Sequence, residues 1–293
     1  MRPGQRPPAT KRVVVLGGGI AGLVAAYELV KRGHPIEVTL LEAAKTLGGK
    51  IRTETTIDQI YETGPDSFLT TKPEMLEIVR ELGLENDLVG TGPDAGVDIL
   101  LGGRLIPMPA GMNLIAPTRL FPFAFSSLFT PGAKLHMALE PFRKTRRDGV
   151  DESLADFTRR RLGPEALERL VAPMLAGIYA GDPERMSVRS TFPQLLEMEK
   201  KGGLVKSMWL GGGRAPRREG LTTFMTLKGG LSKVVDALSR RRAPRSVRLD
   251  CPAQAVRRRD GKWEVVTPNA VLEADAVISA LPAPAFADCI EGL

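Results

Sequence analysis

Glycines gather near the start of the chain in a spacing that can hold a phosphate. Gly17, Gly19 and Gly22 form the pattern G-x-G-x-x-G. The first glycine of such a pattern permits a tight turn, the second lets a pyrophosphate approach the backbone, and the third lets a helix pack closely against a strand. The positions between them are Gly18, Ile20 and Ala21. The spacing predicts a dinucleotide-binding loop at 17–22, with the N–H groups of the following helix facing the phosphates.

The elements around this loop are those that a dinucleotide site needs. The β-branched run at 11–16 predicts a buried strand, and 20–32 has helical spacing of apolar residues up to Gly33. A second strand is expected at 36–41. A strand, a helix and a parallel strand within about thirty residues form a βαβ unit, so we expect a doubly wound α/β sheet.

Glu42 ends the second expected strand, twenty positions after Gly22. A carboxylate at this place can accept hydrogen bonds from the hydroxyl groups of a ribose. It would repel a 2′-phosphate, which disfavours NADP. NAD and FAD both remain open on this pattern alone.

The composition excludes several classes of protein. The 293 residues are 43% apolar and 26% charged, with a net charge of +7, which is typical of a globular chain with a buried core. No apolar run reaches the length of a membrane span. Cys251 and Cys289 are far apart, so we predict neither a disulfide framework nor a metal site, and we expect a cytoplasmic protein.

Three arginine runs, at 159–161, 240–242 and 257–259, contribute to the positive charge. Aromatic residues make up only 5% of the chain and do not alternate with these runs. We therefore expect solvated surface there and no nucleic-acid partner. Residues 1–10 are expected to form a disordered, basic lead-in.

Further elements are expected along the chain. Short strands are predicted near 51–53 and up to Glu62, and a hairpin at 97–107. Helices are expected at 73–82, 153–162, 164–176 and 231–240. Strands return near 247–249, 253–257, 263–267 and 271–280, and the stretch 206–220 is the most linker-like.

Two segments after the glycine loop carry a family resemblance. LGGKIR at 47–52 resembles the Gly-Gly element of the flavoproteins that include amine oxidases, phytoene desaturases and protoporphyrinogen oxidases. ETGPDSF at 62–68 is similar to the next FAD contact of that family. The resemblance implies a discontinuous Rossmann-like FAD-binding domain with an inserted, mainly helical domain, and it selects FAD over NAD.

Other segments narrow the resemblance to the protoporphyrinogen and coproporphyrinogen III oxidases, in their bacterial, Gram-positive-like branch. They are GPDSF at 64–68, GIYAGD at 177–182, STFP at 190–193, LKGGL at 227–231 and SALPA at 279–283. The implied domains are an FAD-binding domain at 11–72 and 225–293, part of a substrate-binding domain at 73–98 and 211–224, and a helical domain for substrate access or membrane contact at 99–210.

The resemblance also implies roles for particular residues. It places the FAD phosphates at 17–22, the adenosine ribose at Glu42 and Ala43, and the adenine near Ala253. Further FAD contacts are implied at Gly49, Lys50, Gly64, Pro65, Asp66 and Ser67. Gly177, Ile178 and Tyr179 would line a tetrapyrrole cavity. Arg104 lies near the position of a propionate-binding arginine in plant relatives, although Ile106 occupies the aligned position itself.

The implied reaction is FAD-dependent oxidation of a porphyrinogen to a porphyrin in haem biosynthesis, with oxygen as the acceptor. The substrate is coproporphyrinogen III or protoporphyrinogen IX, and the sequence does not choose between them. No protein general base is identifiable, and His34 and His136 lie in no catalytic pattern. Peripheral contact with a membrane and a homodimer are compatible with the resemblance.

Two alternatives keep the same fold. One is a flavin oxidoreductase that acts on an amine or a carotenoid, and the other is a non-catalytic nucleotide-binding or membrane-surface module. Relatives continue well beyond the position that matches Leu293. We therefore expect this chain to be an N-terminal part that by itself binds FAD weakly and turns over little.

Overall fold

The computed structural model divides the chain into two compact units. Unit 1 consists of Met1–Thr91 and Arg218–Leu293, and unit 2 of Gly92–Arg217. The structure describes residues 10–92, 96–109, 112–113, 116–117, 125–146, 148–210, 220–240 and 246–292. All predicted FAD contacts fall in unit 1, whereas Arg104 and 177–179 fall in unit 2.

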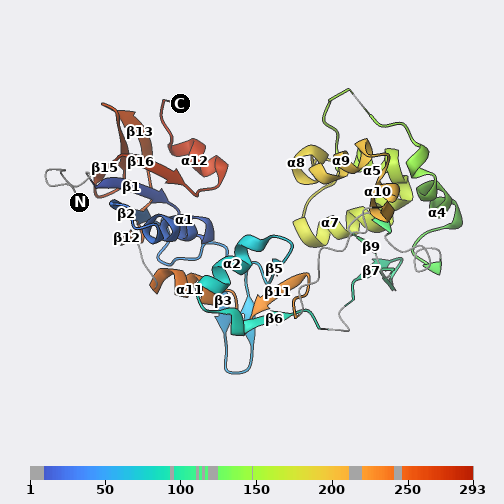
Figure 1. Cartoon of the computed structure of the whole chain (residues 1–293), viewed down its shortest axis with the longest axis horizontal. Coiled ribbons are helices and arrows are strands. Elements are labelled where there is room, and N and C mark those ends of the chain that lie inside the picture. Colours follow the sequence, from blue (N-terminus) through green and yellow to red (C-terminus); the bar gives the residue numbers. More distant parts are fainter. Residues whose placement is uncertain are drawn as a thin grey trace, which may run out of the picture. The chain divides into compact units, whose positions relative to one another are not determined.

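Unit 1 is built on a parallel sheet of four strands in the order β12-β2-β1-β16 (Figure 1). The predicted strand β1 (Lys11–Leu16) and strand β2 (Ile36–Leu41) have the expected bounds, and helix α1 (Ile20–Lys31) joins them. Val13 of β1 faces Val38 of β2 in register. The other two strands, β12 (Ser246–Arg248) and β16 (Ala276–Ser279), come from the C-terminal part of the chain.

An antiparallel sheet of three strands precedes β16 and packs beside the parallel sheet. Its strands are β13 (Ala255–Arg259), β14 (Lys262–Val266) and β15 (Val271–Ala274). The expected single strand at 271–280 is therefore wrong. At Asp275 the chain leaves the antiparallel sheet and enters the parallel one, and the Asp275 N–H donates to the carbonyl oxygen of Arg12. A period-two pattern cannot reveal such a change of sheet.

The helices of unit 1 share one core with the parallel sheet. Helices α1, α2 (Pro73–Glu81) and α11 (Ser232–Arg240) bury their apolar faces there. The buried side chains include those of Val15, Leu23, Ala26, Leu40, Val79, Leu227, Val234, Val235 and Leu238. Helix α12 (Ala283–Cys289) follows β16 and buries Cys289 in a second cluster with Cys251.

Short strands complete unit 1. The hairpin β3 (Thr53–Thr55) and β4 (Ile60–Glu62) follows the Gly-Gly element. A small antiparallel sheet in the order β5-β11-β6 was not predicted, because its strands are only two to four residues long. They are β5 (Phe68–Leu69), β6 (Leu88–Gly90) and β11 (Phe224–Leu227), with the 3-10 turn η1 (Glu85–Asp87) before β6.

The described part of unit 2 is mainly helical, and its elements pack around one apolar core. The hairpin β7 (Asp98–Leu101) and β8 (Arg104–Pro107) packs Ile99 into this core. The helical elements are α4 (Pro131–Ala138), η2 (Glu140–Phe142), α5 (Leu154–Leu162), α6 (Pro164–Ala166), the π-helical turn η3 (Leu167–Val171), α7 (Ala172–Tyr179), α8 (Val188–Thr191), α9 (Pro193–Lys200) and α10 (Leu204–Leu210). Two short strands, β9 (Met112–Asn113) and β10 (Ala116–Pro117), pair with each other.

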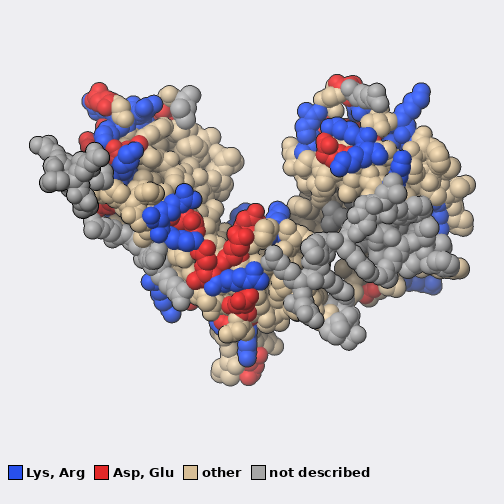
Figure 2. Space-filling view, in the orientation of Figure 1, with Lys and Arg blue, Asp and Glu red and all other residues tan. Residues whose placement is uncertain are grey.

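The expectation of solvated arginines is wrong for one run. Arg161 is fully buried, and its guanidinium forms an ion pair with the equally buried Glu140. Arg160 bridges Glu152 and Glu199. On the face drawn in Figure 2, Lys and Arg are interspersed with Asp and Glu, which fits many local ion pairs better than a single basic face.

The limits of the units differ from the domains implied by the resemblance. Residues 73–91 and 220–224 pack with unit 1, through α2, β6 and β11. The roles of 73–98, 211–224 and 99–210 in substrate binding stay predictions, and residues 1–9 and 211–219 lie outside the described residues. No described helix is long and apolar enough to cross a membrane.

Candidate functional site

The glycine loop connects β1 to α1 as the spacing predicts. Gly17 has a φ of +96°, which glycine adopts without strain, and its N–H donates to the Leu41 carbonyl oxygen over 2.8 Å. A Cβ atom added at Gly22 would lie 1.9 Å from the Gly17 carbonyl oxygen. No side chain caps α1, so the first N–H groups of this helix, at Ile20 and Ala21, are open to a phosphate.

Glu42 lies against this loop from the end of β2. One carboxylate oxygen accepts a hydrogen bond from the Gly18 N–H over 2.5 Å, and the other accepts one from the Ala44 N–H over 2.8 Å. These bonds fix the carboxylate beside the loop. Each oxygen keeps a lone pair for a further donor such as a ribose hydroxyl. Ala43 is exposed beside it.

The Gly-Gly element packs directly on the glycine loop. The Gly48 N–H donates to the Gly18 carbonyl oxygen over 2.8 Å, and Gly48 bridges to Gly19 like a further strand. A Cβ atom added at Gly49 would lie 3.1 Å from the Cα atom of Gly19. Lys50 follows with an exposed side chain. Two segments about thirty residues apart in the sequence therefore form one cradle.

The turn at 64–67 joins this cradle through its backbone. A Cβ atom added at Gly64 would lie 1.8 Å from the Lys50 carbonyl oxygen, so only glycine permits this approach. Pro65 and Asp66 are exposed, and the Ser67 hydroxyl donates to the Asp66 carboxylate over 2.8 Å. A hollow of about 640 Å³ opens here, and it is lined by Gly49, Lys50, Arg52, Glu54, Thr63, Gly64 and Pro65.

Ala253 lies near the Glu42 end of the cradle. The Cys251 N–H donates to the Glu42 carbonyl oxygen over 2.9 Å, and the Asp250 N–H donates to the Ala44 carbonyl oxygen over 3.0 Å. These bonds bring the chain before β13 alongside 42–44. Ala253 is half-buried two residues further on. The structure therefore gathers every predicted FAD contact in one part of unit 1.

The predicted substrate residues lie in unit 2. Ile178 and Tyr179 end helix α7, where Ala180 has a left-handed backbone with φ of 47°. Both side chains are about half exposed, and the Tyr179 ring packs edge-on against Phe192 at a centroid distance of 5.7 Å. Gly177 has open space around it. Arg104 is exposed in the β7–β8 hairpin, where it faces Leu101.

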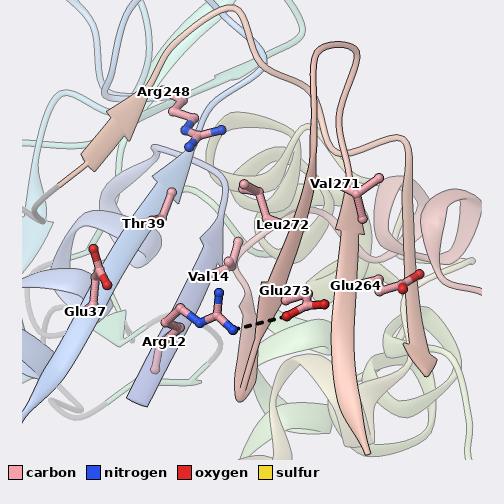
Figure 3. A pocket seen from close by; sticks show the side chains of 10 residues that line it. Arg12, Val14, Glu37, Thr39, Arg248, Glu264, Val271, Leu272 and Glu273 are labelled. Carbon is pink, nitrogen blue, oxygen red and sulfur yellow. Dashed lines mark hydrogen bonds and ion pairs between the residues drawn. The ribbon is translucent and has the colours of Figure 1, made fainter. Parts of the chain in front are cut away.

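A second hollow, of about 510 Å³, separates the two sheets of unit 1 (Figure 3). Arg12 and Arg248 come from the parallel sheet, and Glu264 and Glu273 come from the antiparallel sheet. Arg12 spans the gap in a 3.2 Å ion pair with Glu273. Elsewhere between these two sheets, the Lys262 ammonium lowers the pKa of Asp275, mainly through a direct hydrogen bond. None of the predicted FAD contacts lines this hollow.

Sequence reasoning missed three residues of the candidate site. Arg52, Glu54 and Thr63 line the hollow, and the Thr63 N–H donates to the Arg52 carbonyl oxygen over 2.9 Å. Arg52 and Thr63 lie close together because β3 and β4 form a hairpin. The sequence predicted two short strands there but not their pairing. Among the described residues no group of His, Cys, Asp or Glu has the arrangement of a metal site. A protein general base stays unidentified.

The geometry fits an elongated dinucleotide such as FAD. Backbone lines the loop where a pyrophosphate would lie, and glycine is required there because side chains would overlap the backbone of Gly17 and Lys50. Glu42 presents its carboxylate oxygens beside the loop, and this negative charge disfavours a 2′-phosphate there. The cradle then continues from the Gly-Gly element to the turn at 64–67.

Comparisons with known proteins show which proteins this chain resembles. The coproporphyrinogen III oxidase of Bacillus subtilis is 35% identical over 293 residues, which are 97% of this chain and 62% of that protein. The protoporphyrinogen oxidase of Homo sapiens is 33% identical over 303 residues, which are 96% of this chain and 61% of that protein. This chain therefore spans about 60% of the length of these relatives.

Solved structures show the same fold. A protein from Exiguobacterium sp. 255-15 assigned as a protoporphyrinogen oxidase has a TM-score of 0.77 and 34% identity, over 94% of this chain and 60% of that one. A putrescine oxidase with bound putrescine has a TM-score of 0.65 over 95% of this chain and 60% of that one. Its identity of 15% shows a shared fold only.

A family model described as flavin containing amine oxidoreductase matches residues 20–291. This match confirms an amine-oxidase-like α/β fold, and it confirms the prediction of FAD rather than NAD as the cofactor. Because the match runs through the whole of the described cradle after its first glycines, the chain belongs to the flavin-containing amine oxidoreductases.

Proposed function

We propose that this protein is an FAD-dependent porphyrinogen oxidase of haem biosynthesis, with coproporphyrinogen III as its substrate and oxygen as the electron acceptor. The observation that carries the proposal is the continuous cradle from Gly17 to Ser67 in a chain that is 33–35% identical to oxidases of this kind over almost its whole length. The flavin, when bound, accepts a hydride from the substrate.

The residues of this chain bind and orient the cofactor. The first turn of α1 faces the pyrophosphate, Glu42 holds the ribose, and the backbone around Gly49 and Gly64 shapes the remaining length. Lys50 and Arg52 line the hollow beside them together with Glu54, which lies 3.9 Å from the Arg52 guanidinium, so the lining keeps a net positive charge. Positive charge there favours an anionic group, which suits the cofactor phosphates and the carboxylates of a coproporphyrinogen.

For the substrate we propose contacts in unit 2. Gly177, Ile178 and Tyr179 would line the tetrapyrrole cavity, supported by the exposed apolar and aromatic surface that Ile178 and Tyr179 present at the end of α7. Arg104 is exposed and would be available to a propionate. Coproporphyrinogen III is preferred because the bacterial relatives named for it include the 35% identical protein from Bacillus subtilis.

The test is a comparison of substrates under anaerobic conditions. The chain, supplied with FAD, is mixed with coproporphyrinogen III, with protoporphyrinogen IX, or with putrescine. The proposal predicts loss of the oxidised flavin absorption with coproporphyrinogen III, as the flavin takes up two electrons. Formation of the porphyrin needs three such oxidations, so its fluorescence should develop once air is admitted, and faster than in a sample without the protein. Equal or faster bleaching by putrescine would favour an amine oxidase instead. A loaded protein that reacts with no substrate would favour a non-catalytic nucleotide-binding module.

We also propose that unit 2 makes peripheral contact with a membrane surface. Leu135, Leu139 and Phe142 are about half to four-fifths exposed and follow one another at helical spacing along α4 and η2. Apolar side chains in such a row can enter a lipid interface. Flotation with phosphatidylcholine vesicles tests this: the protein should float with the vesicles, and Phe142→Ser should weaken the association. Flotation that Phe142→Ser leaves unchanged would contradict the assignment.

A further inference from the structure

Glu62 ends strand β4 directly before the turn at 64–67, and its carboxylate contacts the start of helix α11. One carboxylate oxygen accepts a hydrogen bond from the Leu231 N–H over 2.6 Å. The other accepts a hydrogen bond from the Thr53 hydroxyl over 2.8 Å. Glu62 does not line the hollow formed by its neighbours in the sequence. Its contacts instead join segments 169 positions apart.

Thr53 completes this junction between the hairpin and the helix. The Ser232 N–H donates to the Thr53 hydroxyl oxygen over 3.0 Å, and the Thr53 N–H donates to the Ser232 hydroxyl oxygen over 2.8 Å. The first N–H groups of a helix have no partner within the helix. Here two of them are satisfied by β3 and β4, in the way that a local capping box would satisfy them.

The junction is closely packed around Gly230. This residue has a φ of +92°, and a Cβ atom added to it would lie 2.2 Å from the Thr53 methyl carbon and 2.9 Å from a Glu62 carboxylate oxygen. Only glycine adopts this backbone and leaves this space. Gly230 therefore permits close contact with the hairpin, which its position in the sequence does not reveal.

Helix α11 also supports the other side of the cradle. A Cβ atom added at Gly48 would lie 3.5 Å from both methyl groups of Val235. From the hairpin side, Gly64 rests on the Lys50 carbonyl oxygen, and the Thr63 N–H donates to the Arg52 carbonyl oxygen. The Gly-Gly element and the turn at 64–67 are thus both held against α11, the turn through Glu62.

From this geometry we infer that Glu62 is a positioning residue of the flavin site: its carboxylate fastens the β3–β4 hairpin to the start of α11 and thereby sets where the turn at 64–67 lies in the cradle. The inference rests on the proposed FAD site. In it, Glu62 acts on the site indirectly, through the turn that it holds in place, and does not contact the cofactor.

The first experiment needs no flavin. Hydrogen exchange is measured in the 293-residue chain and in the variants Glu62→Ala, Glu62→Gln and Asp58→Asn. Asp58 lies exposed in the same hairpin and makes no described hydrogen bond or ion pair, so Asp58→Asn removes the same charge without touching the junction. Glu62→Ala should speed exchange at 63–68 and at Leu231 roughly tenfold, with the loop at 17–22 unchanged.

The second experiment measures the FAD dissociation constant of each variant by quenching of flavin fluorescence. Glu62→Ala should raise the constant roughly tenfold, because part of the binding free energy must then order the turn. Glu62→Gln keeps an oxygen for the Leu231 N–H and should recover more than half of the loss in both experiments. Asp58→Asn should match the original chain.

The outcomes separate this inference from the proposed function. Three results would each overturn the inference. The first is unchanged exchange at 63–68 in Glu62→Ala, and the second is unchanged FAD affinity of Glu62→Ala when the original chain binds FAD. The third is a Glu62→Gln protein that is as impaired as Glu62→Ala. If Glu62→Ala does not fold, Glu62→Gln and Asp58→Asn decide it in the same way. A parent chain that binds no FAD would contradict the proposed function, and the exchange result would then decide the inference by itself.

Discussion

Gly22 shows at the scale of one residue why the loop excludes side chains. An added Cβ atom would lie 1.9 Å from the Gly17 carbonyl oxygen, so Gly22→Ala must push α1 away from β1. We expect a loss of about 1–3 kcal/mol in the free energy of unfolding and no measurable FAD binding. Chemical denaturation and flavin titration check this.

Gly132→Ala is the matched control for this change. Gly132 lies in the first turn of α4, and an added Cβ atom would meet nothing within 4 Å. This substitution should leave stability unchanged or raise it by at most about 1 kcal/mol. A Gly22→Ala protein as stable as the control would contradict the close approach of Gly22 to Gly17.

Glu42 is the other residue on which the cradle depends. It accepts hydrogen bonds from the Gly18 and Ala44 N–H groups, and in the proposed site also from the ribose. Glu42→Ala should weaken FAD binding at least about tenfold, which corresponds to about 1.4 kcal/mol. Glu37→Gln, in strand β2 and outside the cradle, should bind FAD like the original chain. Equal affinities for the two variants would refute the assignment of Glu42.

At the scale of elements, the buried pair of Glu140 and Arg161 joins η2 to α5 in unit 2. Glu140 also accepts hydrogen bonds from the Leu204 N–H over 3.0 Å and the Val205 N–H over 3.1 Å at the start of α10. Glu140→Ala removes the hydrogen-bonded carboxylate of the buried Arg161 guanidinium, which keeps the longer 3.7 Å pair with Glu199. The change should cost about 3–5 kcal/mol in urea denaturation. Glu197→Ala breaks the exposed pair with Lys200 and should change stability by about 0.5 kcal/mol or less.

His136 in α4 contacts Arg143 directly after η2, and this contact should make the stability of unit 2 depend on pH. Partial burial lowers the pKa of His136 below 6.5, and the Arg143 guanidinium, 2.6 Å from the imidazole, lowers it further. The folded chain then binds a proton less readily than the unfolded chain. The stability that neutral His136 contributes is therefore complete above the ordinary histidine pKa of 6.5 and is lost as the pH falls through the lower folded value.

A variant without the imidazole tests this dependence. Between about pH 7.5 and about pH 5.5, the original chain should lose more free energy of unfolding than His136→Gln, because glutamine does not titrate in this range. Urea denaturation at both pH values gives the difference. Parallel losses in the two proteins would show that His136 has no part in the pH dependence.

The elements also show what the sequence could predict. The strands at 11–16 and 36–41 match because each is rich in the β-branched and apolar residues of a buried parallel strand, and the helix expected at 153–162 begins where the Ser153 side chain caps α5. The change of sheet at Asp275, the burial of Arg161 and the junction at Glu62 were not predictable. Each depends on partner residues far away in the sequence, which a local sequence pattern cannot predict.

At the scale of the whole molecule, the chain returns to unit 1 after unit 2, and the return supplies what the first part lacks. Residues after 220 add β12 and β16 to the parallel sheet, α11 behind the Gly-Gly element, and the segment at 250–253 beside 42–44. The family resemblance of 227–231 and 279–283 indicated that the chain returns to the FAD-binding domain. Secondary-structure propensities alone indicated only further strands and a helix.

The central claim is that unit 1 carries a single FAD site built from 17–22, Glu42, 49–50 and 64–67. Titration of the 293-residue chain with FAD, followed by quenching of flavin fluorescence, tests it most directly. The account predicts saturable binding of one FAD per chain, with binding absent in Gly22→Ala, at least about tenfold weaker in Glu42→Ala, and unchanged in Gly132→Ala. Binding that does not saturate, or that all four proteins share with one dissociation constant, would contradict it.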